Sequence, residues 1–338
     1  MAWQGIQGHD VIFERFRSAQ IRNRLSGSFL FIGASGIGKR LFAFTLARAL
    51  LCLSGGSRQL EPCGVCESCR QFSFATAVSH DQISPIPSHP DLFYISKPAD
   101  KSFIPLDFLI GGKDHRGEEG LCFDISRTPF LGKQKVAIID DADYLNPEGA
   151  NALLKTLEEP PPDSLIILIG TSTAKQLPTI RSRCRIIRFT PLSSRILASI
   201  LLNHNIVESL EQGLNLAKRS NGSFDQAREL FDDAIDKIRV ELNKQLSAKN
   251  IDSVSLASQL NTFVDEAGKE APVRRKRFKL LLNLATESFR EKLKQADSYD
   301  TIQSAAKKLD TTLEAAEQID TNANIPFVIE SWCNKLVT

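Results

Sequence analysis

The feature that most constrains this chain is a glycine-rich turn that joins a short apolar run to a helical pattern. Residues 33–39 read Gly-Ala-Ser-Gly-Ile-Gly-Lys, directly after the apolar residues 29–33 and before a helical pattern over residues 40–53. Small residues in such a turn let successive backbone N–H groups point at phosphate oxygens, and the helix N-terminus adds partial positive charge. The order of strand, G-x-x-x-x-G-K loop and helix therefore predicts a phosphate-binding loop. Its binding residues would be Gly33, Gly36, Gly38 and Lys39.

Three more apolar runs indicate buried strands, at residues 136–140, 165–170 and 186–189, each bounded by glycine, proline or polar residues. A helix is predicted over residues 147–159, because Asn146 can cap it and a proline suits its first position. Strands that alternate with helices at this spacing predict an α/β domain with a mostly parallel sheet.

The strand signals end after Pro191, and the remaining sequence has helical patterns. We predict three domains: an α/β domain over residues 1–190, a small helical domain over residues 191–235 and a helical C-terminal domain over residues 236–338. Residues 80–135 are harder to interpret. Their prolines and glycines predict a surface excursion around the sheet, with one short helix near residues 105–110.

Composition places the chain among globular proteins of a reducing compartment. The formal net charge of the 338 residues is only +2, so a nucleic-acid contact would need a local basic patch. No apolar run reaches the roughly 18–20 residues of a membrane span, and the first residues do not resemble a secretory signal. We therefore expect a cytoplasmic protein without a membrane contact. The seven cysteines, an odd number, argue against an extracellular disulfide framework.

The residues that would complete a nucleotide hydrolysis site are altered. Lys39 is followed by Arg40, where a hydrolysing loop has Ser or Thr as a magnesium ligand. Residues 138–143 read Ile-Ile-Asp-Asp-Ala-Asp, in which Asp140 takes the place of the carboxylate that orients magnesium. Asp141 follows, in the place of the glutamate that polarises water, and its side chain is shorter. The alternative is an acidic strand end without a metal role.

Four cysteines predict a structural metal site. Cys52, Cys63, Cys66 and Cys69 have the spacing C-x10-C-x2-C-x2-C. Four thiolates suit tetrahedral zinc and leave no position open for catalysis. Reduced thiols without a metal and an iron–sulfur cluster are the alternatives. The isolated Cys122, Cys184 and Cys333 are expected to be ordinary buried thiols.

Two further motifs give the chain a family resemblance. Residues 151–160 read Asn-Ala-Leu-Leu-Lys-Thr-Leu-Glu-Glu-Pro, and Ser182-Arg183-Cys184 follow the third apolar run. Together with the phosphate loop and the cysteines, in this order, they resemble the bacterial clamp-loader branch of the AAA+ ATPases. The resemblance implies an AAA+ α/β domain with a zinc module near residues 52–69, a small helical lid domain and an all-α collar domain for oligomerisation.

In that family the arginine of the Ser-Arg-Cys motif is an arginine finger that enters the ATP site of the neighbouring subunit. The resemblance assigns this role to Arg183, with Ser182 and Cys184 as its motif; a solvated basic loop is the alternative. It also implies gamma/tau and delta subunits, a sliding clamp and primed DNA as partners, and single-strand DNA-binding machinery as a further one. The associated process is DNA replication by the DNA polymerase III holoenzyme.

Within the family the sequence favours the delta-prime type over the ATP-hydrolysing gamma/tau motor. Arg40 and Asp141 depart from the motor pattern, and Asp225 replaces the arginine of a Gly-Ser-x-Arg motif that begins at Gly222. Residues 322–330 also resemble a delta-prime ending. We therefore expect no independent catalysis, and leave open whether ATP or ADP binds. A gamma/tau-type motor is the first alternative, and a scaffold that retains the fold without nucleotide is the second.

Two segments remain outside these motifs. Arg274, Arg275, Lys276, Arg277 and Lys279 are predicted to form a solvated helix face, with phosphate contact as the alternative. Residues 103–133 form a longer segment than the family pattern has, and the sequence assigns them no role.

Overall fold

The structure is a computed structural model that describes residues 3–54, 59–74, 87–98, 100–231, 233–247, 252–268, 270–296, 298–321 and 323–337. It divides into two compact units, Met1–Arg228 and Glu229–Thr338. The boundary falls near the end of the predicted small helical domain, so the structure groups most of residues 191–235 with the α/β unit. The division into three domains stays a prediction about independently folding parts.

A five-stranded parallel sheet forms the centre of the first unit, in the order β4-β5-β6-β1-β7. Its strands are β1 (Gly27–Ile32), β4 (Leu92–Ile95), β5 (Lys135–Ile139), β6 (Ser164–Gly170) and β7 (Arg185–Arg188). In β1 alternate residues enter two different cores, with Phe31 on one face and Leu30 on the other, because successive side chains of a strand point to opposite faces. The central strands β1, β5 and β6 are therefore buried on both faces, which explains their continuous apolar runs, while the edge strands β4 and β7 are more exposed.

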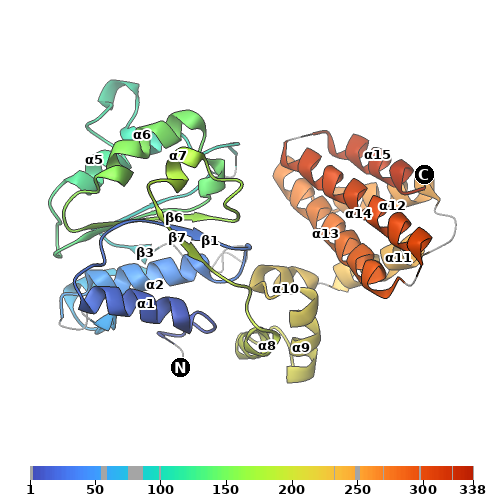
Figure 1. Cartoon of the computed structure of the whole chain (residues 1–338), viewed down its shortest axis with the longest axis horizontal. Helices are drawn as coiled ribbons and strands as arrows, with labels where there is room; N and C mark the ends of the chain where they lie inside the picture. Colours follow the sequence, from blue (N-terminus) through green and yellow to red (C-terminus); the bar gives the residue numbers. More distant parts are fainter. Residues whose placement is uncertain are drawn as a thin grey trace. The chain divides into compact units, whose positions relative to one another are not determined.

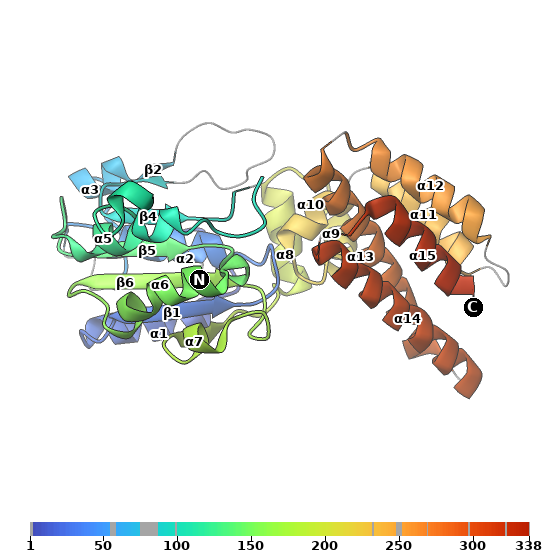
Figure 2. The same ribbon diagram turned by 90° about the horizontal axis from the view of Figure 1, so that it is seen from above.

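Helices cover both faces of this sheet. Figure 1 shows α1 and α2 on one side and α5, α6 and α7 on the other, and the view in Figure 2 shows neighbouring strands side by side. The α-helices of this layer are α1 (Asp10–Ile21), α2 (Lys39–Leu51), α3 (Glu67–Gln71), α4 (Asp107–Ile110), α5 (Leu121–Ser126), α6 (Pro147–Glu158) and α7 (Pro178–Arg181). Two 3-10 turns, η2 (Lys113–His115) and η3 (Ala142–Tyr144), and a small antiparallel pair, β2 (Ser73–Phe74) with β3 (Pro87–Ser88), complete it.

The prediction for residues 80–135 is wrong for one element. Residues 92–95 form β4, which pairs with β5 as an edge strand of the main sheet. Asp91, just before β4, is fully buried and accepts N–H bonds from Phe130, Leu131 and Gly132 at 2.5, 2.9 and 3.1 Å. A strand of four residues gives too short an apolar run to stand out in a proline-rich sequence. The short helix predicted near residues 105–110 corresponds to α4, and residues 80–86 lie outside the described residues.

The helices after β7 fall into two groups. The first unit contains α8 (Ser194–Asn203), α9 (Leu210–Arg219) and most of α10 (Phe224–Leu230), whose last two residues lie past the boundary. The second contains α11 (Asp233–Ser247), α12 (Ser253–Asp265), α13 (Ala271–Gln295), α14 (Tyr299–Asp320) and α15 (Ile325–Val337). Their core holds Phe278 and Trp332, whose indole N–H donates to Thr312 Oγ1 at 3.1 Å. Of the helices in the described ranges, none has the length and apolarity that crossing a membrane requires.

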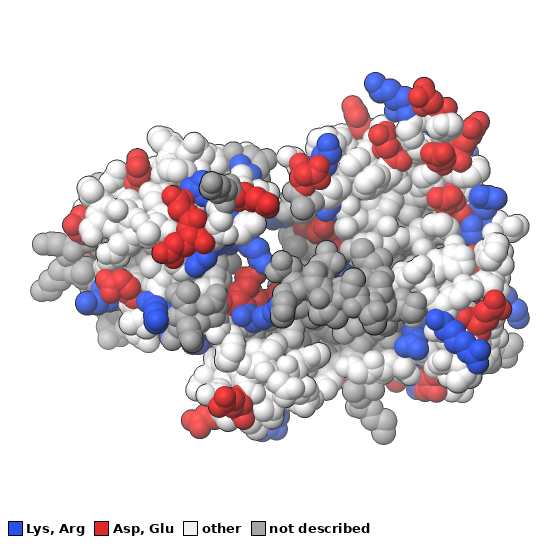
Figure 3. Space-filling model, turned by 180° about the vertical axis from the view of Figure 1, so that it is seen from behind, with Lys and Arg blue, Asp and Glu red and all other residues white. Residues whose placement is uncertain are grey.

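Several residues of the basic run at the start of α13 make contacts within the second unit, although the Lys276 side chain is 74% exposed. Arg274 pairs with Asp265, Lys276 Nζ lies 2.8 Å from Glu229 Oε1, and the Arg277 guanidinium lies 4.0 Å from the centre of the Phe263 ring. On the face of the molecule that Figure 3 shows, basic and acidic side chains are intermixed. The prediction of a solvated face is therefore wrong for Arg274 and Arg277, and these contacts give no support to a phosphate-binding role.

Candidate functional sites

The phosphate loop lies between β1 and α2, as the sequence predicts. Gly36 and Gly38 have φ of 72° and 96°, a left-handed backbone that side chains with a Cβ rarely adopt. A Cβ on Gly33 would lie 2.6 Å from the Phe189 carbonyl oxygen. The His9 ring contacts the loop, with Nε2 2.7 Å from the Ile37 carbonyl oxygen. The glycines are thus required by the backbone path and by close packing.

The Lys39 side chain is bound to the loop itself. The residue is only 7% exposed, and Nζ donates to the carbonyl oxygens of Gly33 and Ala34 at 2.7 and 2.5 Å. Burial lowers the pKa of this ammonium, and the carboxylates of Asp140, Asp143 and Asp225 oppose the change. A phosphate that bound here would have to draw Lys39 away from these carbonyls.

The Arg40 guanidinium pairs with the carboxylate that the sequence predicts to orient magnesium. Nε of Arg40 donates to Oδ2 of Asp140, which also accepts a hydrogen bond from the Tyr94 hydroxyl at 3.2 Å. The other oxygen of Asp140 accepts from the Asp141 N–H at 2.9 Å. A guanidinium has no acceptor atom and cannot ligate magnesium. The carboxylate expected to orient magnesium is therefore already paired with a cation from its own chain.

Two further acidic residues lie near the loop in positions unsuited to hydrolysis. Asp141 has φ of 55°, and its pKa is raised by burial and then by the Asp140 carboxylate. Asp225, at the start of α10, packs against the loop: a Cβ on Gly36 would lie 2.8 Å from the Asp225 Cβ. The Phe224 N–H donates to the Gly36 carbonyl at 2.8 Å and fixes this contact. An acidic group thus occupies the place of the arginine that the motor pattern has.

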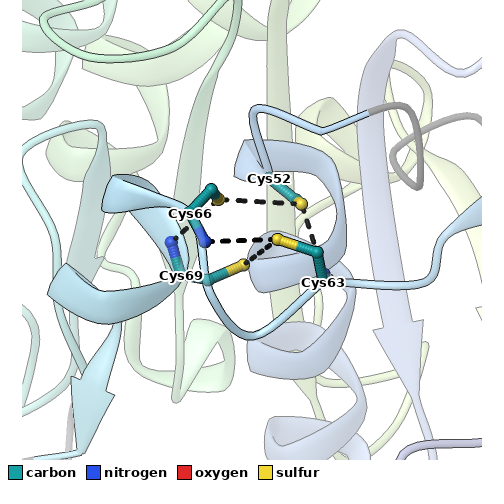
Figure 4. A group of neighbouring side chains, drawn as sticks. All are labelled: Cys52, Cys63, Cys66 and Cys69. Carbon is teal, nitrogen blue, oxygen red and sulfur yellow. Dashed lines mark hydrogen bonds between the residues drawn. The ribbon is translucent and has the colours of Figure 1, made fainter.

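The four predicted metal ligands come together at the end of α2. Figure 4 shows the sulfur atoms of Cys52, Cys63, Cys66 and Cys69 facing one another. All four lie within 4.8 Å, and the Cys52–Cys66 and Cys63–Cys69 sulfur pairs are 3.9 and 4.0 Å apart. Zinc with four thiolates at about 2.3 Å needs sulfur–sulfur distances of about 3.8 Å, so the cluster fits this ion.

Backbone N–H groups support thiolates in this cluster. The N–H groups of Cys63, Cys66 and Cys69 donate to the sulfurs of Cys52, Cys63 and Cys66 at 3.4, 3.3 and 3.4 Å. The pKa of Cys63 is lowered to about 5, first by a hydrogen bond with Ser54 and then by the N–H groups of Val65 and Cys66. Thiolates are the form that binds a metal, so these donors favour the ligand state of Cys63, while burial raises the pKa of Cys69 to about 12.

The Ser182-Arg183-Cys184 motif follows α7 and leads into β7. Cys184 is buried, which raises the pKa of its thiol to about 12 and makes it a packing residue. Ser182 Oγ donates to the Thr179 carbonyl at 3.1 Å. The Arg183 side chain is 29% exposed, and its Nε donates to Glu158 Oε2 at 3.0 Å. The motif thus places one half-exposed guanidinium between two anchored neighbours.

Comparison with known proteins identifies the family. The family model described as "DNA polymerase III, delta subunit" matches residues 8–193, which is more than half of the chain. The chain belongs to the DNA polymerase III delta-subunit family. Its relatives include the delta-prime subunit of Bacillus subtilis, 31% identical over 185 residues, covering 55% of this chain and 48% of the relative. The delta-prime subunit of Pseudomonas aeruginosa is 32% identical over 157 residues, covering 46% of this chain and 41% of the relative.

Tau/gamma subunits are also similar to this delta-subunit family member. The tau/gamma subunit of Haemophilus influenzae is 30% identical over 235 residues, covering 68% of this chain and 30% of that protein. The matched region spans about half the length of the B. subtilis delta-prime subunit. The prediction of a delta-prime-type protein of the clamp-loader family is confirmed. The site residues are assigned by their geometry alone.

The sequence missed residues that tie the cysteine cluster of this family member to its sheet. Ser68 Oγ donates to the Leu51 carbonyl at 2.6 Å and lies 2.9 Å from His89 Nε2, while His89 Nδ1 accepts the Asp91 N–H at 3.0 Å. All of these side chains are buried. No motif marks His89, because it lies twenty positions after Cys69 along the chain. The Tyr94 contact with Asp140 was missed for the same reason.

Replacing Arg40 with alanine is expected to lower the free energy of unfolding by about 2 kcal/mol, because it leaves the buried Asp140 carboxylate without its cation. The side chain of Asp140 is 7% exposed. Arg17→Ala is the control, since Arg17 and its partner Glu14 are 41% and 53% exposed and such a pair contributes under about 1 kcal/mol. Urea unfolding measures both variants. An Arg40→Ala effect no larger than that of the control would contradict the assignment.

Proposed function

We propose that this chain is a delta-prime-type subunit of a bacterial clamp loader that supplies Arg183 in trans to the ATP site of a neighbouring motor subunit. The observation that carries the proposal is the Arg40–Asp140 ion pair. It uses the carboxylate on which magnesium would depend, so the chain's own site is unsuited to metal-assisted phosphoryl transfer. The role left to the chain in ATP turnover is to complete a site that belongs mainly to another chain.

The loop geometry supports the role in trans. A planar guanidinium delivered by a neighbour neutralises charge that develops on the γ-phosphate. Arg183 is half-exposed, lies on a turn between α7 and β7, and is supported by the buried Cys184. The partners that follow from this role are gamma/tau and delta subunits, a sliding clamp and primed DNA, within DNA replication. The four-cysteine cluster holds a structural zinc ion in this proposal.

Reconstitution tests the proposal. The isolated chain, incubated with ATP, magnesium and primed DNA, is expected to release no phosphate above background. Adding it to gamma/tau and delta subunits is expected to give clamp loading on primed DNA that depends on this chain. Steady turnover by the isolated chain that Lys39→Ala abolishes would instead identify a gamma/tau-type motor, the alternative that the tau/gamma relatives favour. A complex that loads clamps equally well without the chain would exclude both roles.

Nucleotide binding separates this function from a scaffold that has lost the site. We expect any ATP or ADP binding by the isolated chain to be insensitive to magnesium, because Arg40 already neutralises Asp140. Isothermal titration with and without magnesium measures this. Binding that strengthens more than about tenfold with magnesium would contradict the assignment of Arg40.

A further inference from the structure

The Arg183 guanidinium is held within its own subunit by the end of another motif. Nε donates to Glu158 Oε2 at 3.0 Å, and Nη1 lies 3.3 Å from both the Thr179 carbonyl and Ser182 Oγ. Glu158 is the last residue of α6 and belongs to the Leu-Glu-Glu-Pro end of the motif over residues 151–160. Helices α6 and α7 pack together, and this packing brings two motifs 25 positions apart into contact.

The contact of Arg183 with the Glu158 carboxylate resembles the contact that Arg183 would make with a phosphate of the neighbour's nucleotide. Carboxylate and phosphate both present anionic oxygens to a guanidinium fork. The contacts above use Nε and Nη1 of Arg183, and within the described residues Nη2 donates no hydrogen bond. Part of the fork is thus available while the rest is held. The Glu158 side chain is 60% exposed, so the pair is weak and is exchanged readily for another anion.

We propose that Glu158 is a positioning residue that holds Arg183 in the separate subunit and releases it to the γ-phosphate of the neighbour's nucleotide. The inference rests on the proposed role of Arg183 in trans. The ion pair favours one rotamer of this long side chain in the separate subunit. It also competes with the incoming phosphate, so Glu158 sets how tightly the completed site holds ATP.

The first test uses the isolated chain and requires no partner. In ¹⁵N-resolved NMR spectra of arginine side chains, the Nε–H proton of Arg183, assigned with Arg183→Lys, reports the contact with Glu158 through its rate of exchange with water. Glu158→Gln is expected to speed this exchange, and Glu159→Gln is the matched control at the adjacent exposed position. Equal exchange in the wild type and Glu158→Gln would overturn the inference and leave the proposed function intact.

The second test uses the assembled loader. Glu158→Gln is expected to lower KM for ATP at the neighbouring site about two- to fivefold, the range that an exposed ion pair controls, with kcat within about twofold. Glu159→Gln is expected to change neither. A KM unchanged by Glu158→Gln, in a complex whose turnover does require Arg183, would overturn the inference alone. Turnover that persists in Arg183→Ala would overturn the proposed function and the inference together.

Discussion

Replacing Arg183 with alanine is expected to lower ATP turnover at the neighbouring site of the assembled clamp loader by about three orders of magnitude. The reason is that a guanidinium supplied by a second chain neutralises negative charge in the transition state. Ring assembly is expected to survive, because the exposed Arg183–Glu158 pair contributes little to the fold.

The measurement has to isolate one site. For this purpose the phosphate loops of the other motor subunits are inactivated by substitution. Single-turnover ATP hydrolysis then reports only the site that this chain completes. Arg181→Ala is the control, because Arg181 is an exposed basic residue of the same segment. Size-exclusion chromatography of both variants checks assembly. Unchanged turnover in an assembled Arg183→Ala complex would remove the role in trans, and equal losses in both variants would indicate a general effect of basic charge.

Removing the metal from the four-cysteine cluster is expected to lower the free energy of unfolding of the first unit by roughly 3–5 kcal/mol, which corresponds to a fall in Tm of about 10 °C. Cys66→Ser is expected to have the same effect, since it breaks the tetrahedral ligand set. The loss is large because the cluster joins the end of α2 to α3, whose Ser68 is bonded to the Leu51 carbonyl and lies beside His89.

Native mass spectrometry and thermal unfolding test this together. The wild-type chain is expected to carry one zinc ion, and a chelator is expected to remove it and lower Tm. Cys122→Ser is the control: it removes a half-buried thiol outside the cluster and should leave the zinc in place. A purified wild-type chain without metal, whose Tm does not respond to a chelator, would leave the four cysteines as reduced thiols. Iron in place of zinc would support the alternative that the four cysteines hold an iron–sulfur cluster.

Local patterns in the sequence predicted the parts of the fold that are encoded by neighbouring residues. The strands β1, β5, β6 and β7 were predicted to within two residues. The runs of β1, β5 and β6 are continuous because these strands are buried on both faces, whereas in β7 two central isoleucines mark a partly exposed strand. β4 was missed because its four residues are too few to distinguish it from a loop. The four cysteines were grouped correctly by their spacing, since a metal cluster of this kind is built mostly from one short segment.

The candidate sites were predicted less completely, because their decisive contacts join distant positions. The sequence indicated that Arg40 cannot serve as a magnesium ligand, but not that it pairs with a carboxylate 100 positions away. The sequence showed that Asp225 replaces the arginine of a motif, but not that Asp225 packs against Gly36 of the phosphate loop.

The region of the phosphate loop is determined partly by the sequence alone and partly by the tertiary structure. The sequence alone determines the loop, its glycines and the parallel sheet, because these follow from backbone conformation and strand periodicity over short stretches. Only the tertiary structure decides that Lys39 is bound to the loop's own carbonyls, that Arg40 neutralises Asp140 and that Glu158 holds Arg183. The contact of Arg40 with Asp140 depends on the parallel register of the sheet, and that of Glu158 with Arg183 on the packing of α6 against α7, so both bring together side chains that no local pattern relates.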